Sequence, residues 1–295
     1  MIDDQPAVSA LLARGAASGG TQTDAGPGAP APAVTASHGV WRIGPDSASQ
    51  AAEWLAEEVP VALVCNGISH VVMLATPCDL EDFARGFSLT EGVVESIDEI
   101  RSCEVVPTHG GIELRLELSS RAFAGLKDQR RQLAGRTGCG ICGAESIERA
   151  IRPVASVAAR PQVPLAHVSA ALRALDEAQQ IRNDTGATHA AAWVDAAGRL
   201  SLCREDVGRH NALDKLVGAM QQQGIDVAGG FALISSRASY EMVQKAARAG
   251  IGALVAVSAP TALAVRVAHQ AGVALACWAR GDRLTAYTHP EVFGG

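Results

Sequence analysis

Two cysteines, Cys139 and Cys142, lie in a segment that is otherwise rich in glycine. Residues 135–143 read Gly-Arg-Thr-Gly-Cys-Gly-Ile-Cys-Gly, and four glycines in nine residues disfavour a stable helix or strand. A Cys-x-x-Cys pair is typical of half a zinc site, of a thioredoxin-like redox couple, or of a sulfur-carrying thiol with a neighbour. The first candidate chemistry of this chain is therefore thiol chemistry on a loop.

The surrounding residues favour one of these three interpretations over the other two. No second Cys-x-x-Cys, Cys-x-x-His or His-x-x-x-His pair completes a four-ligand zinc site, so we expect no metal. A thioredoxin-like pair follows a strand and begins a helix, whereas Cys139 has glycine on both sides. Persulfide transfer needs an exposed, partly ionised thiol on a segment with reach, which Gly138 and Gly140 provide, while Arg136 favours the thiolate. Persulfide transfer is favoured, and the other two interpretations stay open.

The remaining cysteines and the composition indicate a cytoplasmic globular protein. Seven cysteines, an odd number, do not suggest a secreted disulfide framework, and we expect reduced thiols. A net charge of −6 gives no electrostatic reason to expect nucleic acid as a partner, and no apolar run is long enough to predict a membrane span. Five cysteines stand alone in apolar stretches and are interpreted as small buried hydrophobes: Cys65, Cys78, Cys103, Cys203 and Cys277.

Shifts in composition predict four regions along the chain. Residues 1–37 hold ten Ala, five Gly and four Pro without a sustained period, which predicts a disordered tail. Residues 38–134 form a smaller β-rich domain, 135–168 the glycine-rich Cys-x-x-Cys loop and a proline-marked linker, and 169–295 a layered α/β domain. The expected fold class is therefore α/β.

Periodicity places the elements of both domains. In the first domain, Asn66-Gly67 is a hairpin signal between two strands, and Asp79 is a candidate N-cap for the helix that follows. The strands expected there are 59–65, 70–75, 100–106 and 112–118, followed by a helix at 122–133. The second domain alternates helices 169–181, 209–222, 239–249 and 261–270 with strands 190–195, 200–204, 231–235, 253–257 and 273–277. This alternation predicts a largely parallel sheet.

Several longer segments resemble one known family. The segment 135–143 resembles the signature loop of the FdhD family, and residues 204–216, Arg-Glu-Asp-Val-Gly-Arg-His-Asn-Ala-Leu-Asp-Lys-Leu, resemble its longest motif. Residues 236–241 and 287–290 are similar to further family segments, as are Asn66-Gly67, Thr76-Pro77 and Glu91-Gly92 in the first domain. The resemblance runs from about Trp41 to the C-terminus.

The resemblance implies a function and partners. Members of this family are sulfurtransferases that accept sulfur from a cysteine desulfurase as a persulfide. The resemblance places this persulfide on Cys139, with Cys142 in support. The sulfur then passes to the molybdenum cofactor in its bis-molybdopterin guanine dinucleotide form. The sulfurated cofactor is required by formate dehydrogenase. The resemblance also implies a cytidine-deaminase-like fold for the second domain, and a homodimer. The alternative is a non-catalytic chaperone that only shelters this cofactor for formate dehydrogenase.

Deaminase chemistry itself is not expected. A zinc deaminase carries His-x-Glu at one helix start and Pro-Cys-x-x-Cys at the next. Here His210 is followed by Ala212 where the Glu would act, and residues 235–239 contain no thiol.

The resemblance also implies where the cofactor binds. Six residues after the last expected strand are similar to the family segment that contacts the guanine dinucleotide: Trp278, Ala279, Arg280, Gly281, Asp282 and Arg283. Two arginines can meet a diphosphate, a carboxylate can accept from a guanine edge and an indole can stack, so GDP should serve as a mimic. Helix starts at Arg209, His210 and Arg237 are a second candidate for phosphate, because free N–H groups and the helix dipole attract anions. A solvated turn and ordinary helix capping are the alternatives for these residues.

Overall fold

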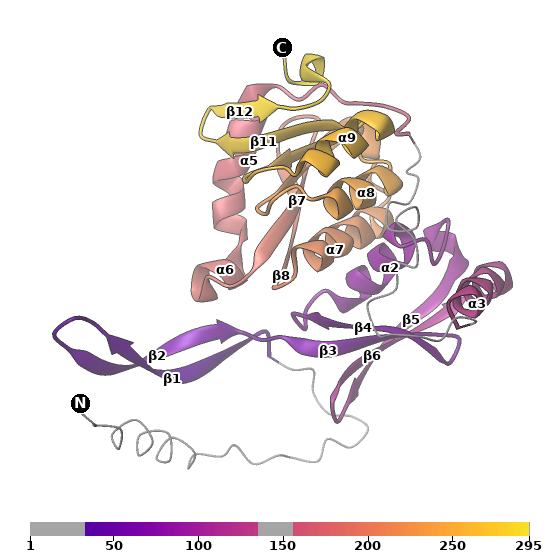
Figure 1. The fold of residues 1–295 in the computed structure, drawn as a ribbon, viewed down its shortest axis with the longest axis horizontal. Helices are drawn as coiled ribbons and strands as arrows, with labels where there is room; N and C mark the ends of the chain where they lie inside the picture. Colours follow the sequence, from indigo (N-terminus) through magenta and orange to yellow (C-terminus); the bar gives the residue numbers. More distant parts are fainter. Residues whose placement is uncertain (1–32, 135–155, 295) are drawn as a thin grey trace, which may run out of the picture.

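A computed structural model describes residues 33–134 and 156–294, which form two sheets with their helices and a projecting hairpin (Figure 1). Among these residues no helix is long and apolar enough to cross a membrane. The predicted tail, apart from its last few residues, and the glycine-rich loop with Cys139 and Cys142 lie outside the described residues.

The N-terminal sheet has four strands in the order β4-β3-β6-β5. Its elements are β3 (Val59–Cys65), β4 (Ile68–Ala75), α2 (Leu80–Thr90), η1 (Ile97–Glu99), β5 (Ile100–Thr108), β6 (Gly111–Leu118) and α3 (Ser120–Ala134). Asn66 and Gly67 both have positive φ, 47° and 77°, as a tight turn between antiparallel strands requires, so the predicted hairpin is confirmed. The four strands expected in this region are all present.

Two expectations for this region are corrected. A hairpin of β1 (Thr35–Ile43) and β2 (Ala48–Ala56) precedes the sheet, so residues 35–37, assigned to the disordered tail, belong to a strand. Asp79 does stand at the start of α2, but its φ is 50° and its side chain makes no capping hydrogen bond. Its carboxylate lies 3.6 Å from Arg204 instead, so a long-range ion pair replaces the local cap.

The C-terminal sheet has six strands in the order β12-β11-β10-β9-β7-β8. The helices are α5 (Leu165–Ala178), α6 (Gln180–Thr185), α7 (Arg209–Gln222), α8 (Tyr240–Arg248) and α9 (Ala262–Ala271), with short turns η2 (Val227–Gly229) and η3 (Pro290–Phe293). The strands are β7 (His189–Asp195), β8 (Leu200–Asp206), β9 (Gly230–Ile234), β10 (Ala253–Ala256), β11 (Ala274–Arg280) and β12 (Arg283–Ala286). Helix α5 packs on one face, and α7, α8 and α9 pack on the other (Figure 1).

This sheet is mixed, so the expectation of a largely parallel sheet is wrong. Only β9, β10 and β11 run parallel as neighbours; β7 is antiparallel to β8 and β9, and β12 to β11. The reason is connection length, because β7–β8 and β11–β12 are joined by short turns, and parallel neighbours need a crossover. The helix expected at 169–181 is also broken at Gln179. The carboxylate of Glu205 accepts hydrogen bonds from the backbone of Ile181 and Arg182, both 2.9 Å long, and thereby starts a new helix.

The two sheets share one hydrophobic core. Helix α2 packs along α7, and the buried residues of both sheets form a continuous cluster that includes Phe83, Leu114, Leu213 and Met242. Gly86 and Gly218 allow the close approach of the two helices: a Cβ on Gly86 would lie 1.7 Å from the carbonyl oxygen of Asp214. The N-terminal sheet is therefore fixed against the α7 face of the C-terminal sheet.

Candidate functional site

The residues with the family-like cofactor sequence form a β-hairpin. β11 continues to Arg280, past the expected end of the strand at residue 277. Gly281 and Asp282 make the turn and Arg283 begins β12, so these residues form an antiparallel hairpin with Arg280 opposite Arg283. The pairing is irregular between Cys277 and Arg280, and Trp278 has φ 56°. Such a bulge redirects a side chain, and the indole of Trp278 is 44% exposed although its neighbours in β11 are buried.

A cavity of about 490 Å³ lies against this hairpin. It is lined by Trp278, Arg280, Asp282 and Arg283 together with Leu165, Leu284, Thr285 and Phe293. The guanidinium carbon of Arg280 lies 5.7 Å from the centre of the Trp278 ring. One aromatic face, two guanidinium groups and one carboxylate can accommodate a flat base and a phosphate group. Ala279, which is buried, and Gly281, which has φ 56°, form the hairpin but do not line the cavity.

The helix starts named from the sequence meet at one edge of the C-terminal sheet. Strands β8, β9 and β10 all end at this edge, and α7 and α8 begin there (Figure 1). Nε2 of His210, in the first turn of α7, lies 2.7 Å from the carboxylate of Glu241 in α8. Neither α7 nor α8 has a side-chain cap, whereas Thr261 caps α9 by accepting a bond from the Ala264 N–H. The two uncapped starts are thus the ones able to bind an anion.

Arginine side chains lie beside these two helix starts. Burial, and then the guanidinium groups of Arg209, Arg182 and Arg237, lower the pKa of His189 below its ordinary value. The Nε of Arg209 is buried and finds no hydrogen-bond partner within residues 33–134 and 156–294. Three guanidinium groups that act on one imidazole form a cationic cluster at the sheet edge. An anionic ligand would complement this cluster.

The cationic cluster and the hairpin cavity lie along the same edge of the sheet. The loop after β9 bridges to the loop after β10 through Ala238 and Pro260, and the Trp278 N–H donates to the Ser258 carbonyl over 3.2 Å. Because β11 is parallel to β10, Trp278 stands near the end of its strand at this edge. Open α/β sheets bind ligands at the carboxyl ends of their parallel strands. This row of loops is the candidate functional site.

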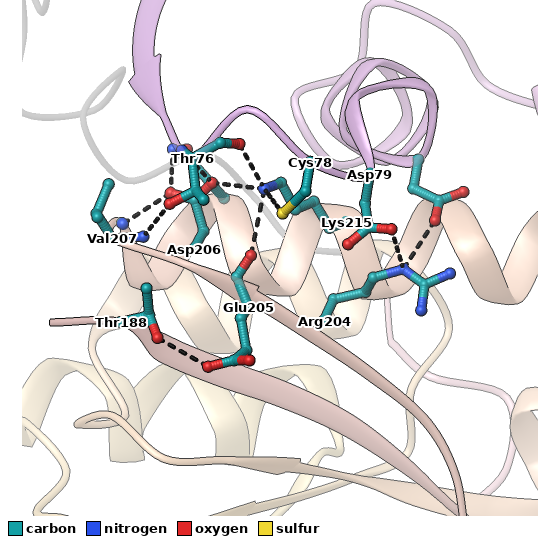
Figure 2. A network of polar contacts seen from close by, with 12 residues as sticks. Thr76, Cys78, Asp79, Thr188, Arg204, Glu205, Asp206, Val207 and Lys215 are labelled. Carbon is teal, nitrogen blue, oxygen red and sulfur yellow. Dashed lines mark hydrogen bonds and ion pairs between the residues drawn. The ribbon is translucent and has the colours of Figure 1, made fainter. Parts of the chain in front are cut away.

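Most of the long motif at 204–216 does not face this edge but joins the two sheets (Figure 2). Asp206 and Lys215 are both fully buried and lie 2.8 Å apart. One Asp206 oxygen accepts from the Thr76 N–H, and the other accepts from the Gly208 N–H and from the side chain of Asn211. Lys215 also donates to the carbonyls of Thr76 and Glu205. The motif therefore ties the loop between β4 and α2 to the start of α7.

A second buried ion pair links α7 to α8 and to the end of α2. The Nζ of Lys245 lies 2.9 Å from Asp214, 2.7 Å from Glu91 and 3.1 Å from the hydroxyl of Thr90. Burial alone would lower the pKa of Lys245, but the carboxylates of Asp214 and Glu91 outweigh it, and the pKa is raised. Lys245 is therefore a cation at neutral pH and helps to hold three helices together.

The family model described as the FdhD/NarQ family matches residues 56–293. The chain belongs to this family. The match covers both sheets, and the β1–β2 hairpin lies before it except for Ala56.

Several relatives of this FdhD/NarQ protein are named sulfur carrier protein FdhD. The one from Bordetella petrii is 57% identical over 237 residues, which are 80% of this chain and 85% of the relative. The one from Cupriavidus necator is 55% identical over the same share of this chain and 82% of the relative. A crystal structure from Desulfotalea psychrophila, described as a candidate formate dehydrogenase accessory protein, aligns with a TM-score of 0.70 at 23% identity. It covers 88% of this chain and 100% of that chain, so the fold is shared.

The thiols of the described residues do not belong to the candidate site. Cys65 and Cys277 are buried, as expected, whereas Cys78, Cys103 and Cys203 are only half-buried. Burial raises the pKa of Cys78 and Cys103 to about 11 and that of Cys203 and Cys277 to about 12, which leaves them protonated at neutral pH. Within residues 33–134 and 156–294, no group of three or more His, Cys, Asp and Glu side chains could hold a metal ion.

The sequence missed the partners of the buried charges in this FdhD/NarQ fold. Lys245 carries no distinguishing signal in the sequence, and Asp206, Asn211, Asp214 and Lys215 stand out only as members of the family-like segment 204–216. One signal was present: Asp214 and Lys215 stand between Leu213 and Leu216 in a helix with ten buried residues. Charged residues at buried positions indicate partners elsewhere in the fold.

Proposed function

We propose that this FdhD/NarQ protein is a sulfurtransferase that carries sulfur for the maturation of formate dehydrogenase. Relatives that are more than 50% identical over 80% of the chain are named sulfur carrier proteins, which supports the first half of the proposal. The described neighbour in fold is associated with formate dehydrogenase, which supports the second. The odd number of cysteines suits a cytoplasmic setting in which a carrier thiol stays reduced.

The carrier in this proposal is Cys139. Its thiolate attacks the terminal sulfur of a cysteine desulfurase persulfide, the sulfur–sulfur bond of the donor breaks, and the donor thiolate leaves. The product is a persulfide on Cys139, with Cys142 in a supporting role. The five cysteines within the described residues are unsuited to this step. Burial raises the pKa of four of them, and the fifth, Cys65, is buried.

The recipient of the sulfur is the bis-molybdopterin guanine dinucleotide form of the molybdenum cofactor, bound as a substrate. The proposal that the cofactor binds here rests on the hairpin cavity, where Trp278 lies beside Arg280 and Arg283. A guanine can stack on the indole and a diphosphate can pair with the guanidinium groups. The helix starts at Arg209 and Arg237 lie along the same sheet edge, and their N–H groups lack a side-chain cap, so they can bind further phosphate. We also extend the family likeness to a cytidine-deaminase-like layering of the C-terminal sheet and to a homodimer.

Mass spectrometry of the intact chain tests the carrier step. After incubation with a cysteine desulfurase and cysteine, wild-type protein should gain the mass of one sulfur atom, which a thiol reductant removes. Cys139→Ala should gain none, Cys142→Ala should still gain some, and the matched control Cys103→Ala should behave as wild type. Full loading of the Cys139→Ala variant would favour the alternative function, a chaperone that shelters the cofactor without carrying sulfur.

Calorimetric titration with GDP tests the cavity. A charge-assisted contact to phosphate contributes about 1.5–3 kcal/mol, so Arg283→Ala should weaken GDP binding about tenfold to a hundredfold. Arg115→Ala, an exposed arginine on the N-terminal sheet, is the control and should bind as wild type. Unchanged affinity in both Arg280→Ala and Arg283→Ala would move the site to the helix starts.

A further inference from the structure

The hairpin cavity has an apolar wall that the family-like segment 278–283 does not supply. This wall consists of Leu165, the first residue of α5, Leu284 in β12, and Phe293, the last residue of η3. Leu165 is 38% exposed, much like Trp278, although both are large apolar residues beside a buried core. Large apolar side chains left exposed around one cavity indicate a surface for a ligand.

One backbone hydrogen bond brings two parts of the apolar wall together. The Val163 N–H donates to the Val292 carbonyl over 2.8 Å, and both residues are buried. This bond joins the segment before α5 to η3. Because Leu165 and Phe293 follow closely on the two bonded residues, their side chains reach the same cavity.

The segment 287–290 resembles a family motif, yet it lines no part of the cavity. Its buried member is Thr288, whose hydroxyl donates to the Val273 carbonyl over 2.6 Å and accepts from the Leu275 N–H over 2.9 Å. Leu275 belongs to β11, the strand that also carries Trp278. The segment is therefore anchored to the strand of the cavity hairpin.

The next residues turn the chain from this anchor into η3. His289 has φ 51°, a left-handed conformation that residues other than glycine rarely adopt, and it ends the extended path of the chain. Pro290 then begins η3, where its fixed φ suits the first helical position. Phe293 lies one helical turn beyond the anchor. The position of this part of the apolar wall thus depends on Thr288.

We propose that the apolar wall, together with Trp278, binds the guanine base, and that Thr288 is a positioning residue for this wall. This inference rests on the proposed function, since it takes the hairpin cavity to be the cofactor site. Arg280 and Arg283 offer charge to a diphosphate, whereas the apolar wall offers only dispersion and the burial of apolar surface. A flat purine is the part of the nucleotide that such a wall can bind. Base and diphosphate are therefore bound by separate residues.

Calorimetric titration of the full chain with GDP, alone and in competition with pyrophosphate, tests this division. Leu165→Ala and Phe293→Ala should each weaken GDP binding about tenfold and leave pyrophosphate binding unchanged, because pyrophosphate has no base. Arg283→Ala should weaken the binding of both ligands. The matched control is Leu74→Ala, which removes a 54% exposed leucine from β4 and should bind both ligands as wild type does.

A second pair of variants tests the role of Thr288. Thr288→Val removes the hydroxyl that holds η3 and should reproduce the loss of GDP affinity without a loss of pyrophosphate affinity. Thr288→Ser keeps a hydroxyl and should bind GDP as wild type does. A residue that only stabilised the fold would not separate the two ligands in this way.

The outcomes separate this inference from the proposed function. If Arg283→Ala weakens GDP binding but Leu165→Ala and Phe293→Ala do not, the inference is overturned and the cofactor site stands. Equal losses for GDP and pyrophosphate in the wall variants would also overturn it, since they would reflect a general distortion of the cavity. A wild type that binds neither ligand would overturn the cofactor site and this inference together. If far-UV circular dichroism shows that Phe293→Ala is unfolded, Leu165→Ala decides, because Leu165 lies at an exposed helix start.

Discussion

Replacing Lys215 by methionine should destabilise the protein strongly, although the lysine is far from any surface. The Nζ of Lys215 lies 2.8 Å from Asp206, and both side chains are fully buried. Methionine fills the space of the lysine stem but leaves the Asp206 carboxylate without its counter-charge. It also removes one donor each from the carbonyls of Glu205 and Thr76, of which Thr76 keeps the Cys78 N–H. Breaking a buried ion pair from one side costs about 3–5 kcal/mol.

The expected loss is large because total stabilities are small. A domain is usually stable by about 5–15 kcal/mol, so Lys215→Met removes about a third or more of a typical value. The cost should be near the lower end of its range, since Asp206 keeps three donors: the backbone of Thr76 and Gly208 and the side chain of Asn211. These bonds continue to stabilise the ionised carboxylate.

Urea unfolding, followed by tryptophan fluorescence, measures this loss. The control is Arg115→Met, because Arg115 also lies 2.8 Å from a carboxylate, that of Glu113, but on the exposed face of the N-terminal sheet. An exposed pair contributes about 0–1 kcal/mol, so the control should unfold close to wild type. If Lys215→Met lost no more stability than Arg115→Met, the buried pair would not be what fixes the two sheets, and the reasoning would fail.

Three further predictions test packing, thiol chemistry and the anion site. Gly86→Ala should lower the free energy of unfolding by about 1–3 kcal/mol or more, because its Cβ would meet the α7 backbone. Gly125→Ala, which has open space in α3, should raise the free energy of unfolding by about 0.5–1 kcal/mol in the same urea assay. Iodoacetamide at neutral pH should label Cys139 and Cys142 quickly and the five other cysteines slowly, as peptide mass spectrometry can show. Phosphate bound at the helix starts should raise the depressed pKa of His189 in an NMR titration, whereas GDP held only by the β11–β12 hairpin should leave it unchanged. Because His189 has a lowered pKa when folded, its contribution to stability is present above about pH 6.5 and is lost as the pH falls below that value.

The sequence predicted the regular elements well where one face is buried. Helix α7 was expected at 209–222 and has those bounds, and the strands β3, β6 and β10 were placed within one or two residues. In β6, apolar residues alternate with polar ones because one face contacts the shared core, whereas β10 is buried on both faces and is a short continuous apolar run.

Elements without a buried face were missed. The β1–β2 hairpin has only exposed and half-buried residues, so its sequence lacks the alternation that a core imposes. β12 has four residues, none of them buried, and the sequence predicted no strand there. The connection lengths were visible in the sequence, however, and short turns at Gly198 and Gly281 could have predicted the antiparallel edges of the C-terminal sheet.

The residues of the candidate site were predicted from the sequence, but their arrangement in space was not. Trp278, Arg280 and Arg283 were named through the family resemblance, and the geometry adds the bulge that exposes the indole and the cavity beside it. The buried networks could not be derived from local sequence, because Lys215 and Lys245 donate to Thr76 and Thr90 across 139 and 155 residues of chain. Only the fold brings such partners together.

These buried networks bear on sulfur transfer because of where the glycine-rich loop is attached. Helix α3, the last described element before the loop, ends at Ala134 and belongs to the N-terminal sheet. The described chain resumes at residue 156, and the Val157 N–H donates to the Ala271 carbonyl, so the other end belongs to the C-terminal sheet. The two attachment points are therefore held in place by the packing of α2 on α7 and by the Asp206–Lys215 pair, which bonds to Thr76 in the loop before α2. In the proposed sulfur transfer, a variant that loosens this pair should impair delivery of sulfur to the cofactor more than loading of Cys139. Delivery depends on how the ends of the loop, at Ala134 and residue 156, are held relative to the hairpin cavity.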